Sequence, residues 1–369
     1  MKITLKRTQE QLELVKAMAS KNREVAYEAQ MALAEFIGPV LAEVVNNAPT
    51  ISNLFTSVQF DADDNPSIPL DLYHDITDGD YIKVWSQSVA GGLPSNTIMP
   101  THSELKFATY RLDSAVDFDR KYAAKSRLDV ISKTFTRVAQ EVLLKQEKTS
   151  ASLMLGTLSD AGTDSSAPGT ATNHTLVSTT AGRLLLHDLN RLLTRAKRNN
   201  TSWSGGTPDR SRGITDLIVS PEIVESLREM SYNPINEKGV KDQTPDGTNA
   251  GISAPDSVRD ALFNAGGLPE FYGMSIMEIN ELGTGGTYND IYTGVGGSFA
   301  SGRDDLVLAV DRSRDAMLRA VAVDAESGGE FNLVADDQYS VRQQKIGYYG
   351  MIEEGRMVVD NRGLFGIQV

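Results

Sequence analysis

The chain has 369 residues, of which 40% are hydrophobic and 23% charged, as in a globular protein large enough for about two domains. It contains no cysteine, which excludes disulfides and thiolate chemistry. Its net charge of −13 argues against a general attraction to nucleic acids or anionic membranes. No apolar run approaches the roughly 20 residues that a membrane-spanning helix needs.

The N-terminal segment is predicted to be helical from about residue 8 to residue 37, with Gly38-Pro39 as an interruption. We interpret this helix as only weakly apolar, and therefore expect a peripheral arm rather than a core element. The apolar residues at helical spacing are Leu12, Val15, Met18 and Ala19.

A long hairpin is predicted next, from a strand over 81–89 and a returning strand over 102–112, because both partly alternate apolar and polar residues. Such a hairpin has little core of its own, and isolated hairpins are marginal in water. We therefore expect it to lie on a neighbouring copy of the chain. The tip residues expected to make this intersubunit contact are Gly91, Gly92, Leu93 and Pro94.

One long helix is predicted directly after the hairpin, over about 121–155. Its apolar residues step by three and four and form a single stripe. At 1.5 Å per residue the helix would be roughly 50 Å long, which suggests a scaffold role. The stripe consists of Leu128, Ile131, Phe135, Val138 and Val142.

The remaining chain alternates helices, strands and polar loops. Ser220 and Pro221 predict a helix start, with serine as N-cap and proline at the first helical position. Predicted helices cover 181–198, 221–230 and 256–264; predicted strands cover 214–219, 274–279, 305–310, 317–323, 339–351 and 356–369; predicted loops cover 156–178, 232–254 and 282–302.

No motif in the sequence predicts a catalytic, metal or cofactor site. The acidic run 61–65 resembles the start of a calcium loop, but Pro66 stands where glycine is needed and Leu72 where glutamate is needed. The two glycine-rich runs, 283–286 and 294–297, lack the lysine and the βαβ context of a phosphate cradle. The four histidines share no metal-ligand spacing; they are His74, His102, His174 and His187.

The order of parts resembles the major capsid proteins of tailed bacteriophages, which have the HK97-type fold. Nearly the whole chain matches as architecture: a helical arm, an extended hairpin (the E-loop), a long spine helix, a compact α/β domain and a closing β region. The segments with family-like sequence are 115–129, 214–230, 267–276, 311–315, 342–350 and 354–359.

The resemblance implies an α+β fold with four parts: an N-terminal arm, an E-loop, an axial domain and a peripheral domain. The N-terminal arm would cover 1–50 and the E-loop 78–112. The axial domain would cover 181–302. The peripheral domain, with the spine helix over about 121–155, would combine 51–77, 113–180 and 303–369.

The resemblance also implies a structural function without enzyme activity or cofactors. Copies would form hexamers and pentamers of an icosahedral capsid, assembled in the host cytoplasm, around packaged double-stranded DNA. The virion capsid would be the protein's location. DNA would be contacted weakly and without specificity, and portal, scaffold and cement proteins are candidate partners. No membrane partner is implied.

Two alternatives stay open at the level of sequence. An encapsulin-type compartment uses the same kind of shell subunit and would hold cargo enzymes. A carboxylate-based soluble enzyme is the other alternative, since acidic pairs are common in this chain and none stands out. The locally basic helix over 120–148 would be a solvated face, a face paired with acidic residues of neighbouring segments, or a weakly cationic inner surface.

Overall fold

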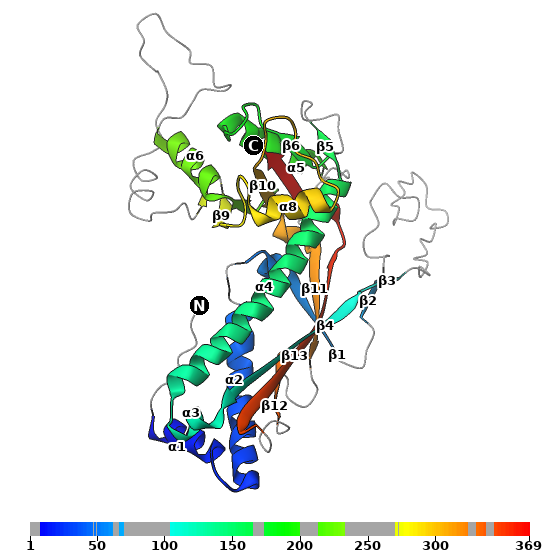
Figure 1. Ribbon diagram of the computed structural model, residues 1–369. Helices are drawn as coiled ribbons and strands as arrows, with labels where there is room; N and C mark the ends of the chain where they lie inside the picture. Colours follow the sequence, from blue (N-terminus) through cyan, green and yellow to red (C-terminus); the bar gives the residue numbers. More distant parts are fainter. Residues whose placement is uncertain are drawn as a thin grey trace, which may run out of the picture. The chain divides into compact units, whose positions relative to one another are not determined.

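The computed structural model of the chain describes residues 8–46, 48, 50–61, 66–69, 104–164, 173–199, 213–232, 270–271, 273–323, 330–336 and 343–369. These residues form helices and sheets, so the prediction of a mixed α+β fold is confirmed (Figure 1). The chain divides into two compact units. Unit 1 comprises 1–66, 107–151 and 318–357, and unit 2 comprises 67–106, 152–317 and 358–369.

Unit 1 is built on a five-stranded sheet that is mostly assembled from the C-terminal part of the chain. Its longest strand, β13, pairs antiparallel with β4 from Lys345 opposite Asp119 to Gly355 opposite Thr109. The strands are β1 (Thr56–Asp61), β11 (Met317–Val323), β13 (Lys345–Val358) and β12 (Asn332–Asp336) in that order, with β4 (Thr109–Asp119) beside β13. β12 lies outside the strands predicted from the sequence.

The N-terminal segment forms two helices, α1 (Gln9–Met18) and α2 (Arg23–Asn46). The predicted interruption at Gly38-Pro39 is wrong, because α2 continues through Pro39. A proline forfeits one backbone hydrogen bond, but packing can offset that loss. α2 packs against β12 around Gly38, where a Cβ would make only ordinary contact, 3.5 Å from the carbonyl oxygen of Phe331. The helical segment is interrupted earlier instead, at Ala19, whose φ of −91° and ψ of 7° end α1.

Both N-terminal helices contribute to the core of unit 1. The expectation that this segment stays out of the core is therefore wrong for these residues. One buried stripe suffices to anchor a helix, whatever its outer face carries. The buried residues are Val15, Met18, Ala29, Leu33, Ala34, Ile37, Leu41 and Val45.

The long helix begins later and ends later than predicted. Arg120–Ala124 form a short helix α3, and α4 runs from Leu128 to Asp160. Ser126 separates them with a left-handed φ of 53°, a conformation that a continuous helix cannot contain. Residues 128–151 of α4 belong to unit 1 and 152–160 to unit 2.

Unit 2 contains a seven-stranded mixed sheet. β10 pairs antiparallel with both β14 and β7, and β7 pairs parallel with β9. The strand order is β5 (Thr163–Asp164), β6 (Thr175–Val177), β14 (Leu364–Gln368), β10 (Leu306–Val310), β7 (Asp216–Val219), β9 (Met274–Glu278) and β8 (Glu270–Phe271). Its helices are α5 (Leu186–Asn199), α6 (Pro221–Tyr232) and α8 (Thr287–Gly294), with 3-10 turns at Arg312–Arg314 and Asn361–Gly363.

Helix α6 begins at Pro221, directly after Ser220, as the sequence predicts. The hydroxyl oxygen of Ser220 accepts a hydrogen bond from the backbone N–H of Ile223 at 3.3 Å, as an N-cap serine does.

The prediction of a continuous loop over 282–302 is wrong, because helix α8 forms in the middle of this segment. Tyr288 and Tyr292 are one helical turn apart and both are buried, which anchors this short helix between two glycine-rich turns.

The predicted returning strand over 102–112 is divided between two strands: β3 (Glu104–Lys106) pairs antiparallel with β2 (Ser67–Pro69), and β4, which begins at Thr109, pairs with β13. The chain therefore leaves at Pro69 and returns at Glu104, and then continues into β4 of the unit 1 sheet. The predicted strand over 81–89, the predicted tip and the predicted helix over 256–264 lie outside the described residues.

Candidate functional site

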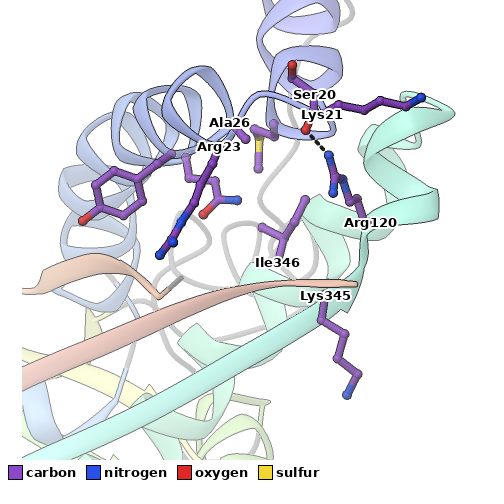
Figure 2. Close-up of a pocket in the computed structure, with 10 residues that line it drawn as sticks. Ser20, Lys21, Arg23, Ala26, Arg120, Lys345 and Ile346 are labelled. Atoms are coloured by element: carbon purple, nitrogen blue, oxygen red, sulfur yellow. Dashed lines mark hydrogen bonds between the residues drawn. The ribbon is translucent and has the colours of Figure 1, made fainter. Parts of the chain in front are cut away.

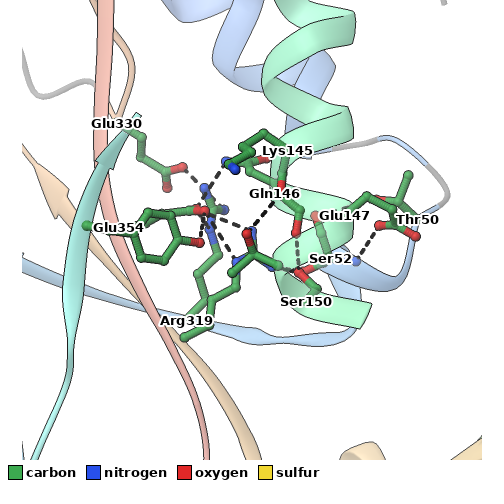
Figure 3. Close-up of polar contacts among 12 residues, drawn as sticks. Thr50, Ser52, Lys145, Gln146, Glu147, Ser150, Arg319, Glu330 and Glu354 are labelled. Carbon is green, nitrogen blue, oxygen red and sulfur yellow. Dashed lines mark hydrogen bonds and ion pairs between the residues drawn. The ribbon is translucent and has the colours of Figure 1, made fainter. Parts of the chain in front are cut away.

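A network of buried charges occupies the centre of unit 1, and Glu354 on β13 is its hub (Figure 3). Its Oε2 accepts hydrogen bonds from Nε of Arg319 at 2.8 Å and from Nε2 of Gln146 at 3.0 Å. Its Oε1 accepts one from the hydroxyl of Tyr110 at 2.7 Å. These donors come from β11, α4 and β4, so one carboxylate connects four elements of the unit.

Arg356, two residues further along β13, extends the network toward the N-terminal part of the chain. Its Nη1 donates to the carbonyl oxygen of Ser52 at 3.1 Å and to the hydroxyl of Ser150 at 2.5 Å. Its guanidinium also lies over the ring of Phe55, 5.4 Å from the centroid. The arginine thereby holds the 3-10 turn η1 (Ile51–Leu54) against α4.

Glu147 on α4 completes the attachment of this turn. Its two carboxylate oxygens accept the backbone N–H groups of Ile51 at 3.1 Å and of Ser52 at 3.0 Å. These are donors at the start of η1 that have no partner inside the turn. The connection between α2 and β1 is thus fixed by side chains that lie far away in the sequence.

The neighbouring arginines keep the carboxylate of Glu354 ionised. Burial by itself raises the pKa of the Glu354 carboxyl, but the charges of Arg356 and Arg319 and the hydrogen bond from Tyr110 outweigh it, so the net pKa lies below its ordinary value. Burial and the nearby Glu354 charge together raise the pKa of Tyr110 to about 12. Tyr110 therefore stays protonated as a donor while Glu354 stays an acceptor.

This network is suited to holding elements together rather than to reacting with a ligand. Both oxygens of Glu354 are occupied by protein donors, and its side chain is 0% exposed. No pattern in the sequence indicated it. Glu353-Glu354-Gly-Arg356 has the composition of an exposed turn, and the partners of Glu354 are remote in the chain.

The surface of unit 1 carries a second feature, a set of exposed apolar side chains. Among the described residues, every large hydrophobic residue that is exposed belongs to unit 1. Half of the set lies on α2, whose opposite face is buried in the core. The members are Val25, Tyr27, Met31 and Phe36 on α2, with Val58, Tyr122, Leu144 and Val334 elsewhere.

The candidate residues from the sequence fall into two groups. The five stripe residues are all buried in the core of unit 1, from Ile131 at 0% exposed to Val142 at 6%. Phe135 in this stripe meets the ring of Tyr348 edge to face, with centroids 5.3 Å apart. The tip residues Gly91, Gly92, Leu93 and Pro94 lie outside the described residues.

His174 and the run 283–286, which were considered above for metal or phosphate binding, both make contacts that stabilise the fold. His174 is buried and its Nδ1 lies 2.9 Å from the carbonyl oxygen of Leu364. The run 283–286 closes on itself as a turn, with the N–H of Gly286 donating to the oxygen of Gly283 at 2.9 Å. In the part of the chain that the structure describes, no three metal-ligating side chains gather, and no helix could cross a membrane.

No family model and no curated protein matches the chain. The capsid of an empty GTA particle is similar over 87% of this chain and 90% of that chain, at 12% identity and a TM-score of 0.49. The capsid of the cyanophage P-SCSP1u is similar over 85% and 86%, at 14% identity and a TM-score of 0.45. The SrpI encapsulin from Synechococcus elongatus is similar over 73% and 76%, at 12% identity and a TM-score of 0.39.

Proposed function

We propose that this chain is the structural subunit of an HK97-type capsid, many copies of which close into an icosahedral shell around double-stranded DNA. Hexamers and pentamers of the chain would be the building blocks. The subunit performs no catalysis in this account. Portal, scaffold and cement proteins are candidate partners, and the virion is its location.

The observation that carries the proposal is the apolar surface of unit 1. Single exposed hydrophobic residues are normal on a monomer, but α2 alone exposes four large ones. Met31 is 52% exposed and Phe36 is 55% exposed, although α2 already buries a full stripe in the core. A helix that is apolar beyond its buried stripe is expected to be covered by another molecule. A neighbouring copy is the occupant that a shell supplies.

The strand pair β2–β3, of which β2 precedes the predicted E-loop over 78–112 and β3 lies within it, is compatible with the same proposal. The two strands β2 and β3 pair over three residue positions, and the chain between them covers residues 70–103. The sequence predicts an extended hairpin that begins within this span. A segment that reaches over an adjacent subunit would give each copy a second point of attachment, which strengthens assembly through multivalency.

The acidic balance is compatible with a container for DNA. A net charge of −13 limits non-specific affinity for the packaged polyanion. The exposed lysines and arginines of α3 and α4 would supply only weak contact, for example Lys121, Lys133 and Arg137.

The experiment is a paired substitution on α2 that leaves the core intact. The variant Met31→Ser/Phe36→Ser removes apolar surface, and the variant Glu28→Gln/Glu35→Gln changes two exposed residues of the same helix as its control. We expect the first variant to melt at nearly the wild-type temperature as a free subunit and to form far fewer particles in sedimentation. Equal particle yield from both variants would contradict the proposal.

A further inference from the structure

Strand β1, at the end of the unit 1 sheet, is held on one side only. It pairs parallel with β11 over its full length, from Thr56 to Asp61, and with no other strand among the described residues. Five of its six residues are exposed and Phe60 is half-buried, whereas six of the seven residues of β11 are buried. The described part of the chain therefore leaves the outer edge of β1 and most of both its faces uncovered.

β1 lacks the features by which the edges of sheets usually avoid further pairing. Natural edge strands are commonly protected by lysines, prolines or a bulge. β1 contains no lysine, arginine, proline or glycine, and its register with β11 runs without a bulge. Its one charged residue is Asp61, at its end. Nothing in the strand itself therefore opposes the addition of another strand.

β4, in the same sheet, shows the contrast. Among the described residues it also pairs with one strand only, β13, but it carries four charged residues. Two of the charged side chains at its end are engaged within unit 1: Asp117 pairs with Lys345 at 2.6 Å, and Asp119 caps α3. Arg120, directly after β4, donates to the carbonyl oxygen of Ser20 in the turn between α1 and α2 (Figure 2). β4 is therefore a protected edge, and β1 is an unprotected one.

The start of β1 is already fixed within the subunit. Glu147 and Arg356 hold η1 against α4, and Phe55, the residue between η1 and β1, lies under the guanidinium of Arg356. A surface that is ordered in advance loses less conformational entropy on binding. β1 is thus a preformed template for one further strand.

We propose that β1 pairs antiparallel with β1 of a second copy of this chain, across a twofold axis at Gln59. This register places Val58 opposite the partner's Phe60 in both directions, and aromatic and β-branched residues pair favourably across strands. Asp61 then lies opposite the partner's Ser57, so no like charges meet. Copies with a net charge of −13 repel each other, and an edge with one charge in six residues lets them approach at low cost.

This inference rests on the proposed shell and adds one type of contact to it. A pair of six-residue strands is much smaller than a stable interface of about 1,600 Å², so it would not hold an isolated dimer. Within a shell, other contacts present the strands to each other, and multivalency makes a small contact sufficient. Twofold β1 pairs would link the rings that heterologous contacts close.

Disulfide trapping tests this register, because the chain contains no cysteine of its own. In Gln59→Cys, the two introduced thiols would be directly opposite, within the roughly 7 Å between Cα atoms that a disulfide can bridge. We expect oxidised particles of this variant to give covalent dimers in a denaturing gel without reductant. Ser57→Cys is the matched control on the same strand, since its two Cα atoms would be about 14 Å apart. It should stay monomeric in the gel.

Val58→Lys, added to Gln59→Cys, gives a second measurement. Val58 is 40% exposed, so the free subunit should melt at nearly the wild-type temperature. A lysine opposite the partner's Phe60 protects the edge, and the yield of covalent dimer should fall about tenfold. Val58→Thr, which keeps a β-branched and uncharged side chain, should preserve the dimer.

The outcomes separate this contact from the shell itself. If the wild type forms particles and Gln59→Cys gives no covalent dimer in them, the β1 pair is overturned and the shell stands. Equal crosslinking of Gln59→Cys and Ser57→Cys also overturns the pair. A specific Gln59→Cys dimer in concentrated chain that forms neither particles nor rings would support the pair and contradict the shell.

Discussion

Arg319 on β11 donates from Nε to Oε2 of Glu354 on β13 at 2.8 Å, and the two side chains are only 4% and 0% exposed. Taking two charges out of water is costly, and such a pair is tolerated because further donors satisfy the carboxylate. Here Gln146 and Tyr110 supply those donors. The pair therefore specifies how the strands and α4 of unit 1 fit together.

Glu354→Gln tests this network directly. The substitution keeps the shape of the side chain but removes the counter-charge that Arg319 and Arg356 share, and leaves Arg319 with only the longer pair to Glu330 at 3.9 Å. We expect the free energy of unfolding to fall by ~3–5 kcal/mol, measured by urea denaturation of the unassembled subunit. Asp117→Asn is the control, because it breaks an ion pair with Lys345 whose side chains are 38% and 39% exposed. It should cost less than ~1 kcal/mol, and equal losses in both variants would contradict the assignment.

The same carboxylate predicts a dependence of stability on acid pH. The pKa of Glu354 in the folded chain lies below its ordinary value of 4.5. Its ionised form therefore stabilises the fold fully above pH 4.5, and this contribution disappears as the pH falls through the lowered folded-state pKa. The difference in unfolding free energy between wild type and Glu354→Gln should shrink between about pH 5 and strongly acidic pH. A difference that stays constant over this range would show that Glu354 is not the titrating group.

Phe135→Ala tests the apolar stripe of α4. Phe135 is 1% exposed and its ring packs on Tyr348, so truncation leaves a cavity. We expect a loss of ~3–5 kcal/mol in the free energy of unfolding. Leu144→Ala on the same helix is the control, since Leu144 is 48% exposed and should cost less than ~1 kcal/mol. Denaturation curves of the two variants would be indistinguishable if the stripe were not core.

Gly297→Ala tests the packing that anchors α8. A Cβ at Gly297 would lie 2.6 Å from ring atoms of Tyr292, a buried side chain that cannot move aside freely. The melting temperature should drop, with ~1–3 kcal/mol lost to overpacking. Gly294→Ala is the matched control, because a Cβ there meets nothing within 4 Å and alanine favours the helix. A similar drop in both variants would place the cause outside the Tyr292 contact.

The sequence predicted the parts of the fold that local patterns determine. The spacing of Leu128, Ile131 and Phe135 indicated the long helix, and Ser220-Pro221 indicated the start of α6. Local patterns failed where tertiary packing decides. The glycines around α8 suggested a loop, but two buried tyrosines stabilise a helix there, and Pro39 lies inside α2 because its neighbours pack against β12.

The buried network could not be predicted for the same reason. Glu354 is separated from Arg319 by 35 residues, from Gln146 by 208 and from Tyr110 by 244. No spacing rule connects residues at such separations. Charged residues in strands are also usually exposed, so a buried glutamate is not what the sequence around Glu354 would indicate.

The most direct test of the central claim is electron microscopy of the purified full chain in negative stain, alone and with candidate scaffold partners. The account predicts closed particles of uniform size or the rings from which they are built. A monodisperse monomer or dimer under every condition tested would contradict it.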